Sequence, residues 1–472
     1  MHIQGRFYHI ILEICIYFRM SINSNFSKLP QNYLFKEVAD RVNKHKALHP
    51  DARIINLGIG DVVQPLSDVL VQAMLKASRE MGDESTFKGY GEYAGCEFLR
   101  ERVAEYYAIK GVSISSDEVF VTDGAKGALS LILELFECGV TVAIPDPVYP
   151  VYVDSNVIRN NNIVYINGNK ENDFLPTADD FMDTLDRLSI DAKSDFSALD
   201  TEKLSTDISQ NVIQNSSNKS FNGSKLQSNL FTNTFCTSVQ KSSITHPNII
   251  YICNPNNPTG AVYDRVTLKG IIDYANQIDA TVLYDAAYEA FVPADDQKYV
   301  SSIFQIAGAE HCAIEIGSLS KSASMSGLRA GFIIMSKNIH KGLYDLYSKL
   351  ISFKTNGVSY ISQVAAHAAL SPQGLNHNQK NITKYLKNAS IIRDTLNKKN
   401  IYNVGGVMSP YIWLQVPNNM SGWDFFDQLL SHGIVGIPGE GFGTQGKGYF
   451  RLSTFGHNAE MIEAMEILNK IL

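Results

Sequence analysis

The stretch Ile249-Ile-Tyr-Ile-Cys253-Asn254-Pro-Asn-Asn257-Pro-Thr-Gly260 joins five apolar residues directly to a polar turn. The apolar run has the length and the β-branched composition of a strand that is buried on both faces. The two prolines and the glycine after it remove backbone donors and fix a turn. The stretch therefore predicts a buried strand that ends in side chains able to form hydrogen bonds.

The same pattern recurs on both sides of this stretch, with helical periodicity between the apolar runs. Continuous apolar strands that alternate with helices favour an α/β fold with a mostly parallel sheet covered on both faces. The expected strands are residues 54–57, 119–122, 141–144, 164–167, 249–253, 281–284, 313–316 and 331–335, and the expected helices include 31–49, 125–137 and 268–277.

A second, smaller α/β domain is expected at the C-terminal end. Strand-like runs at 411–416, 434–437 and 448–453 precede a last helix that ends at Leu472. The predicted organisation is an extension outside the fold at residues 1–19, an arm with part of the small domain at 20–60, a large domain at 61–336 and the small C-terminal domain at 337–472. Residues from about 182 to 245 are rich in Asn, Ser, Lys and Gln, and this composition predicts a disordered surface insertion in the large domain.

Composition excludes several kinds of partner. With 44% apolar and 19% charged residues and a net charge of -7, the 472-residue chain has no basic block for nucleic acid or an anionic membrane. Its six cysteines are scattered and its eleven histidines show no ligand spacing, so we expect a reducing compartment and no metal site.

The N-terminal apolar run is broken by Glu13 and is shorter than the roughly 20 residues of a membrane span. A cytoplasmic protein that starts at Met20 is expected, with organellar targeting as the alternative.

Polar residues follow several expected strands at the point where each strand ends. Asp285 and Tyr288 come after the strand at 281–284, and Asp123-Gly124-Ala-Lys126 comes after the strand at 119–122. Each group alone is read as a cap or a turn. Because ligands bind beyond the carboxyl ends of parallel strands, the groups together predict one site at one sheet edge.

The stretch 318–332, SLSKSASMSGLRAGF, has the composition of a linker but places one lysine among small polar residues and one arginine after them. A lysine amine, a buried carboxylate, an aromatic face and a dianion site of hydroxyls, arginine and helix amides are the requirements of pyridoxal 5'-phosphate. The residues of this stretch and of the strand ends meet those requirements jointly.

At this point the chain resembles a known family. NPNNPTG at 254–260, DAAY at 285–288 and SLSKxxxxxGLRAGF resemble the signatures of fold type I pyridoxal-phosphate aminotransferases, the aspartate aminotransferase superfamily. Further segments resemble the LL-diaminopimelate aminotransferase family in its order, across residues 21–472 apart from the insertion: NYLF at 32–35, IINLGIGD at 54–61, GYG at 89–91, DGAK at 123–126, DPVYPVY at 146–152, CAIE at 312–315, TNG at 355–357 and FRLS at 450–453.

The resemblance implies a role for each matching residue. Lys321 would be the catalytic lysine that forms the Schiff base and moves the proton, and Arg451 would bind the substrate α-carboxylate. A homodimer with shared active sites is also implied, with Tyr90 and Asn356 acting across the subunit boundary. The implied cofactor residues are Tyr90, Ala125, Lys126, Tyr149, Asn257, Asp285, Tyr288, Ser318, Ser320, Lys321, Arg329 and Asn356, and the implied substrate residues are Tyr33, Gly60, Lys126, Tyr149, Asn257, Asn356 and Arg451.

The implied reaction interconverts LL-2,6-diaminopimelate and 2-oxoglutarate with tetrahydrodipicolinate and glutamate, in lysine biosynthesis. One segment departs from the family: Gly89-Tyr-Gly-Glu92-Tyr93-Ala-Gly95 stands where the family has Gly-Tyr-Gly-Pro-Glu-Gln-Gly. The missing acidic residue helps to bind the distal end of the substrate. An aminotransferase for aspartate, aromatic or other amino acids is therefore the alternative, followed by a silent cofactor-binding module and a β-elimination lyase.

A short glycine-rich stretch at 439–443 has only a superficial likeness to a dinucleotide loop, because no strand-to-helix unit surrounds it. We expect a tight turn near the mouth of the substrate site.

Overall fold

The computed structural model describes residues 22–30, 34–58, 60–197 and 246–472, with side chains up to 187 in the third range. The expected extension at 1–19, most of the expected insertion and Tyr33 lie outside the described residues.

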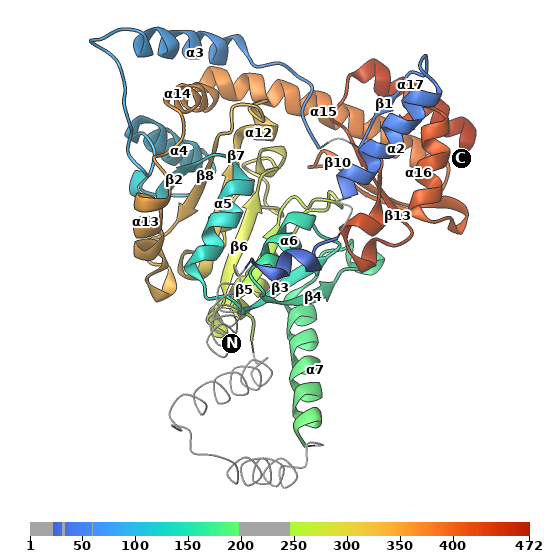
Figure 1. The fold of residues 1–472 in the computed structure, drawn as a ribbon, viewed down its shortest axis with the longest axis horizontal. Coiled ribbons are helices and arrows are strands. Elements are labelled where there is room, and N and C mark those ends of the chain that lie inside the picture. Colours follow the sequence, from blue (N-terminus) through green and yellow to red (C-terminus); the bar gives the residue numbers. More distant parts are fainter. Residues whose placement is uncertain (1–21, 31–33, 59, 198–245) are drawn as a thin grey trace, which may run out of the picture.

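A seven-stranded sheet forms the centre of the molecule (Figure 1). Only β8 runs against its neighbours β7 and β2, and the other strands are parallel, which confirms the predicted sheet type. The order is β2 (Val119–Thr122), β8 (Gly331–Met335), β7 (Ala313–Ser318), β6 (Thr281–Ala286), β5 (Ile249–Cys253), β3 (Thr141–Asp146) and β4 (Asn162–Asn167).

Helices cover both faces of this sheet. Successive strand residues point to opposite sides, and both sets are buried in the central strands, so each face needs a layer of helices. Val142 and Leu283 pack with α5 (Ala125–Ile132), α6 (Pro150–Ile158) and α13 (Leu343–Lys354). Their neighbours Ala143 and Val282 pack on the other side with α7 (Ala178–Ser197), α10 (Arg265–Gln277) and α11 (Ala309–Cys312). At the β2 end of the sheet, α3 (Asp68–Met81), α4 (Glu97–Ile109), α12 (Leu319–Ser322) and α14 (Tyr360–Ala369) share a further cluster.

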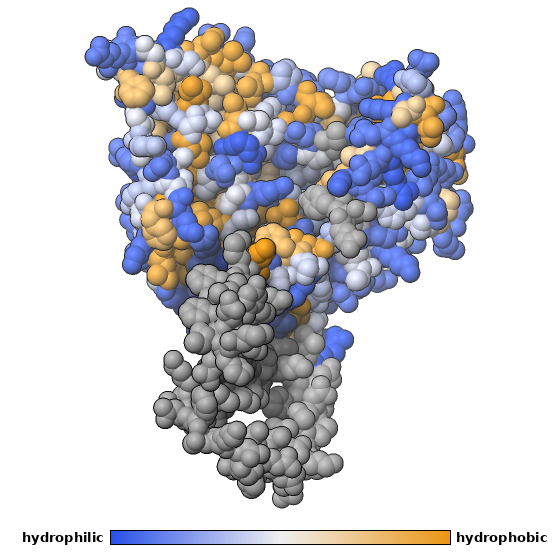
Figure 2. Space-filling view, viewed as in Figure 1, coloured by the Kyte–Doolittle hydropathy of each residue, from blue (hydrophilic) through white to orange (hydrophobic). Residues whose placement is uncertain are grey.

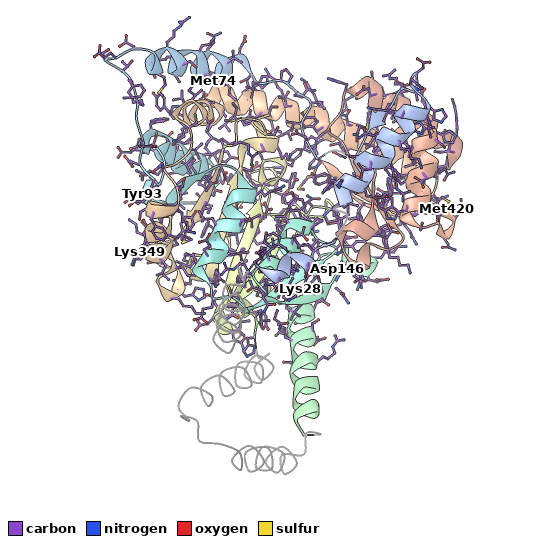
Figure 3. All side chains as sticks on the ribbon, viewed as in Figure 1. Lys28, Met74, Tyr93, Asp146, Lys349 and Met420 are labelled. Atoms are coloured by element: carbon purple, nitrogen blue, oxygen red, sulfur yellow. The ribbon has the colours of Figure 1, made fainter. Side chains whose placement is uncertain are left out.

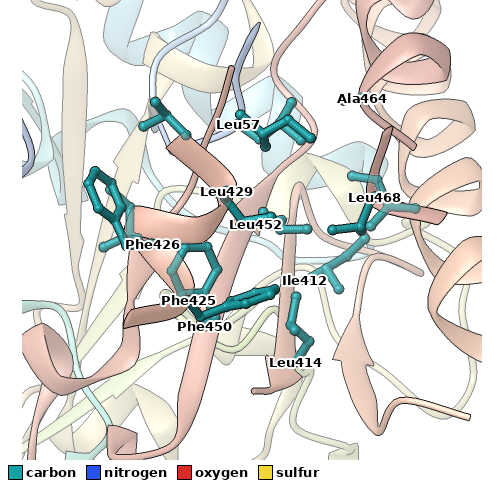
Figure 4. Packing of buried hydrophobic residues seen from close by; sticks show 14 of the residues in the cluster. Leu57, Ile412, Leu414, Phe425, Phe426, Leu429, Phe450, Leu452, Ala464 and Leu468 are labelled. Atoms are coloured by element: carbon teal, nitrogen blue, oxygen red, sulfur yellow. The ribbon is translucent and has the colours of Figure 1, made fainter. Parts of the chain in front are cut away.

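A second core lies around a four-stranded antiparallel sheet (Figure 4). Phe425, Phe450 and Leu452 lie at its centre, and the long helix α15 (Pro372–Lys398) reaches from the first core into this one. The strand order of this sheet is β12 (Ile437–Pro438), β13 (Tyr449–Ser453), β10 (Tyr411–Gln415) and β9 (Asn403–Gly405). Beside it, β1 (Ile55–Asn56) pairs with β11 (Ile434–Val435). The helices that pack into the same core are α2 (Leu34–Leu48), α16 (Gly422–Ser431) and α17 (Asn458–Ile471).

Two expectations about the organisation differ from the structure. Helix α7 continues to Ser197, past the expected start of the insertion, and Phe181 and Leu185 bury its first turns against the sheet. Helices α13 and α14 bury their apolar faces against the large sheet, although residues after 337 were expected in the small domain. The other domain boundaries stay predictions. Among the described residues, no helix combines the length and apolarity needed to cross a membrane.

The strand ends that carry the polar residues meet at one edge. Thr122 of β2 and Ser318 of β7 both pair with Gly331 of β8, so the ends of these two parallel strands lie on either side of one residue. The carboxyl ends of β5 and β6 follow in register, where Cys253 pairs with Asp285. The predicted gathering of polar groups at one sheet edge is therefore present.

Candidate active site

A cavity of about 450 Å³ opens at this edge, between the two sheets. It is lined by residues from the strand ends of the large sheet together with Tyr411 of β10 and Arg451 of β13. Of the residues predicted for the site, the cavity brings together Gly60, Ala125, Lys126, Tyr149, Asn257, Asp285, Tyr288, Ser318, Ser320, Lys321, Arg329 and Arg451.

Two predicted residues do not line this cavity in the single chain. Tyr90 is 90% exposed, and Asn356 lies on an exposed turn after α13. Both were expected to act in the active site of a partner subunit.

Lys321 lies in the short helix α12, directly after β7, and its side chain enters the cavity. Its Nζ donates a hydrogen bond to the carbonyl oxygen of Gly60 and lies 3.9 Å from the Asp61 carboxylate. Burial, and to a smaller extent the nearby cations, lower the pKa of Lys321 to about 8, although Asp61 opposes this shift. A substantial share of the amine is therefore uncharged, and so nucleophilic, at mildly alkaline pH.

Asp285 is the last residue but one of β6 and is 5% exposed. Its carboxylate accepts hydrogen bonds from the backbone N–H of Ala287, at 3.0 Å, and from the hydroxyl of Tyr152. Burial raises the pKa of Asp285, and the two hydrogen bonds partly oppose this effect. Within the described residues no ion pair joins this carboxylate, so a cation supplied by a ligand in the cavity would stabilise its ionised form.

Arg451 is a buried cation without an acidic partner among the described residues. Only 1% of it is exposed; its Nη1 donates to Asn257 Oδ1 at 2.7 Å and its Nη2 to the carbonyl of Gly58 at 2.9 Å. The guanidinium lies 4.5 Å from the ring centre of Tyr411, and its buried Nε has no hydrogen-bond partner. This geometry suits a ligand carboxylate, which guanidinium binds with two parallel hydrogen bonds.

A dianion site is formed where α5 begins. The first N–H groups of a helix lack intrahelical partners, and Ala125 and Lys126 at this end line the cavity. Gly124 has φ +100°, and a Cβ on it would lie 2.5 Å from Nη2 of Arg329, so glycine lets the guanidinium approach the helix end. Ser318, the last residue of β7, and Ser320 of α12 add hydroxyls, and together these groups suit a phosphate.

The sequence missed several residues of the site. Tyr411 lines the cavity and its hydroxyl lies 2.7 Å from that of Tyr288. No local signal marks Tyr411, because it comes from an ordinary buried strand. Asp61 could have been found, since it directly follows the glycine-rich end of an expected strand; Phe35, Leu129, Ala287 and Ser326 also line the cavity.

Hydrogen bonds between Asp146 and the loop at Thr444 fix the position of the neighbouring Phe442 ring, which lies against Arg451. Asp146, labelled in Figure 3, accepts hydrogen bonds from the hydroxyl and the N–H of Thr444. The adjacent stretch at 439–443, expected to be a tight turn, forms a 3-10 helix Gly439–Phe442, and the Phe442 ring lies 4.9 Å from the Arg451 guanidinium. Asp146 thus joins the large sheet to the loop whose Phe442 ring lies against Arg451.

The cavity can bind an anionic ligand and supply a nucleophilic amine. Its charged lining residues are four cations, Lys126, Lys321, Arg329 and Arg451, and two carboxylates, Asp61 and Asp285. In the described part of the chain no cluster of three or more His, Cys, Asp or Glu residues is placed to hold a metal ion. The described lining offers an amine, a buried carboxylate and an excess of positive charge.

The chain is similar to known aminotransferases over most of its length. The model of the family described as "Aminotransferase class I and II" matches residues 52–468. The LL-diaminopimelate aminotransferase of Agathobacter rectalis is 38% identical over 450 residues, which cover 94% of this chain and 98% of that protein. The enzyme of the same name from Lawsonia intracellularis is 37% identical over 470 residues, which cover 95% and 98%.

Among solved structures, L,L-diaminopimelate aminotransferase from Chlamydomonas reinhardtii superposes with a TM-score of 0.77 at 30% identity, covering 96% of this chain and 99% of that chain. The substrate-bound BacF structure from Bacillus subtilis, at 24% identity and a TM-score of 0.72, shares the fold. The match over residues 52–468 and the two curated relatives show that the chain belongs to the class I and II aminotransferase family.

Proposed function

We propose that the cavity binds pyridoxal 5'-phosphate and that the chain transfers an amino group between LL-2,6-diaminopimelate and 2-oxoglutarate. The products of this reaction are tetrahydrodipicolinate and glutamate, and its place is lysine and diaminopimelate biosynthesis. The observation that carries the proposal is the convergence of a lysine amine of lowered pKa, a buried carboxylate without a cation partner and a dianion site in one cavity.

The residues present fit this cofactor. Asp285 would face the ring nitrogen, because it is a buried carboxylate at the cavity with no ion pair among the described residues. Tyr149, a partly buried aromatic side chain at the start of α6, would lie on the ring, and Asn257 and Tyr288 would donate to its phenolic oxygen. The phosphate would be bound by Ala125, Lys126, Ser318, Ser320 and Arg329.

Pyridoxal phosphate, when bound, supplies a carbonyl carbon that takes up the amino group and a ring that acts as an electron sink. Lys321 would hold the cofactor through its amine, and the same amine, when free, would take up the proton from Cα of the substrate. Arg451 orients the substrate by holding its α-carboxylate, and Asn257, its present partner, is the group that the carboxylate would replace or join. Lys126 adds positive charge for a second acidic group of the substrate.

The choice of substrate rests on the relatives, whose printed names include diaminopimelate. An aminotransferase for aspartate, aromatic or other amino acids is the second candidate, and the segment at Glu92 favours it. Glu92 lies 2.8 Å from the Arg100 guanidinium, and neither Glu92 nor the half-exposed Tyr93 lines the cavity of the single chain. The family has an acidic residue at the position of Tyr93. Within the single chain Glu92 does not take over its role, because its carboxylate pairs with Arg100 and lies outside the cavity lining.

The two candidates are separated by measuring glutamate formed from 2-oxoglutarate with LL-diaminopimelate, aspartate and aromatic amino acids as donors. Turnover that is highest with diaminopimelate is expected; no turnover with it would overturn the substrate proposal. Formation of pyruvate and ammonia in place of glutamate would indicate a β-elimination lyase.

The catalytic lysine is tested in the same assay. Replacing Lys321 by Ala should remove both the absorbance of the lysine-bound cofactor and turnover, with a loss of roughly 10⁴-fold or more for a combined nucleophile and proton carrier. Lys269→Ala is the matched control, because the Lys269 side chain is 45% exposed on α10 and does not line the cavity. A Lys321→Ala protein that keeps the absorbance band would mean that another amine binds the cofactor.

A homodimer in the cytoplasm remains a proposal. Apolar side chains are exposed on α3, on the turn that follows it and on α13, among them Leu75, Phe87 and Phe353, and Figure 2 shows apolar patches over this part of the surface. Such a patch fits a second copy of the chain. The test is to mix Tyr90→Ala and Lys321→Ala proteins, because hybrid dimers with one intact shared site should regain activity that neither variant has alone.

A further inference from the structure

Tyr152 makes a contact that the proposed function does not use. It lies in the first turn of α6, is 2% exposed and does not line the cavity. Its hydroxyl donates to Oδ2 of Asp285 at 2.5 Å, while the other carboxylate oxygen, Oδ1, accepts from the backbone of Ala287. These two donors, one to each oxygen, set the orientation of the carboxylate.

The tyrosine is itself held on several sides. Its ring stacks on Tyr251 with centroids 4.9 Å apart and an angle of 20° between the planes. The buried Asn156 donates to both the backbone carbonyl of Tyr152 and the hydroxyl of Tyr251. Because Tyr149 precedes Tyr152 by three residues, the same turn of α6 carries both rings, which meet edge to face at 5.8 Å.

We propose that Tyr152 is a positioning residue, whose hydroxyl fixes the Asp285 carboxylate in the direction of the ring nitrogen of pyridoxal phosphate. This inference rests on the proposed function. Helix α6 would then place two parts of the cofactor site at once, the aromatic face at Tyr149 and, through Tyr152, the carboxylate.

Tyr152 also belongs to the hydrophobic core on this side of the sheet, so a purely structural role is the competing explanation. Tyr251→Phe is a matched control, because it removes the hydroxyl of the stacked neighbour and leaves the Asp285 hydrogen bond in place. Tyr152→Phe keeps the ring and the packing and removes the hydroxyl that donates to Asp285 and also contacts the neutral thiol of Cys253.

The first measurement is the dissociation constant of pyridoxal phosphate from the apoprotein, with the thermal unfolding of the apoprotein beside it. Tyr152→Phe should weaken cofactor binding on the order of tenfold or more, the size of a lost hydrogen bond to a charged group. Tyr251→Phe should bind as the wild type does. Wild-type affinity in Tyr152→Phe, or an equal loss in both variants, would overturn the inference.

The pH dependence of cofactor affinity gives a second readout. The Tyr152 hydrogen bond lowers the pKa of Asp285, so its removal should move the acidic fall in affinity to higher pH. The other groups that face Asp285 are Tyr149, Cys253 and Tyr288, and burial raises the pKa of each, so they remain neutral across this range. An acidic limb that does not move would contradict the inference.

A double-mutant cycle keeps the test decisive if Tyr152→Phe is less stable. In an Asp285→Ala background the Tyr152→Phe change should have no further effect on cofactor affinity, whereas a structural effect would persist there. Failure of the wild-type protein to bind pyridoxal phosphate would instead count against the proposed function.

Discussion

Lys110 and Arg451 are both buried cations, and their surroundings differ in one respect. Lys110 is 5% exposed; its Nζ lies 2.7 Å from the Glu289 carboxylate and also donates to the carbonyl of Ser301. Arg451 has aromatic neighbours as Lys110 does, but among the described residues it has no carboxylate at all. A cation that is neutralised within the chain contributes to the fold, and one that is left without an acid marks where an acidic ligand is expected.

The largest change in the free energy of unfolding is expected when the ion pair between Lys110 and Glu289 is broken. Lys110→Ala leaves the carboxylate of Glu289 buried and unpaired, which costs about 3–5 kcal/mol of unfolding free energy. Urea unfolding of the cofactor-loaded protein measures the change. Lys269→Ala, which breaks an exposed pair with Asp273 on α10, is the control and should cost about 0.5 kcal/mol or less. Equal costs for both would mean that burial does not separate the two pairs.

The next largest effect is expected in the pH at which the amine of Lys321, a cation of the cavity, loses its proton. Its pKa of about 8 lies below the ordinary lysine pKa of about 10.4, so in the apoprotein the amine should react with an amine-directed reagent with a midpoint near pH 8. An unfolded peptide of the same sequence should show a midpoint near ~10.4. Mass spectrometry of the labelled peptide follows the reaction.

The same shift has a consequence for stability. Because the folded-state pKa is lowered, the unfolded chain binds more protons between about pH 8 and 10.5, so Lys321 makes the apoprotein more stable as pH rises through that window. Lys321→Met should remove this rise. An unchanged slope in that variant would place the responsible group elsewhere.

Arg451→Leu tests the unpaired cation. Loss of the charged hydrogen bonds to the substrate carboxylate should weaken binding of the transition state by about 2 kcal/mol, which lowers kcat/KM roughly thirtyfold. The free energy of unfolding should fall by about 1–3 kcal/mol, because Oδ1 of Asn257 and the carbonyl of Gly58 lose a donor. This cost is smaller than that of Lys110→Ala, since no buried carboxylate loses its partner among the described residues. Steady-state kinetics and urea unfolding are measured on the same preparation. A loss of stability as large as that of Lys110→Ala would remove the distinction between the two cations.

The smallest effect is expected at Glu92. Its carboxylate is largely exposed, so Glu92→Gln should change the free energy of unfolding by less than about 1 kcal/mol. Its pairing with Arg100 also predicts that the ratio of diaminopimelate to aspartate turnover stays the same. A changed ratio would show that Glu92 reaches the substrate, for instance in the site of a partner subunit.

Much of the large sheet could be predicted from the sequence. The strands at 119–122, 249–253 and 331–335 have the predicted bounds, because strands buried on both faces are continuous apolar runs between turn residues. The common edge of Asn257, Asp285 and Lys321 followed from parallel pairing alone.

Contacts between distant elements could not be predicted in the same way. Tyr288 and Tyr411 are 123 residues apart, and Tyr152 and Asp285 are 133 apart. Nothing in the periodicity of α6 or β10 shows which neighbour their tyrosines will meet. The packing of α13 and α14 on the large sheet was missed for the same reason, since an apolar helix face does not reveal which core it joins.

The position of the Asn/Ser-rich segment in the crossover has a practical consequence. Helix α7 runs back from the site edge, and β5 begins again at Ile249, so the chain leaves and re-enters the described fold at the amino-terminal edge of the sheet (Figure 1). Residues Lys321, Asp285 and Asn257 lie at the opposite edge. This junction is therefore a suitable place to attach a fluorescent label or an affinity tag, because an added group there is separated from the reacting atoms by the full length of the strands.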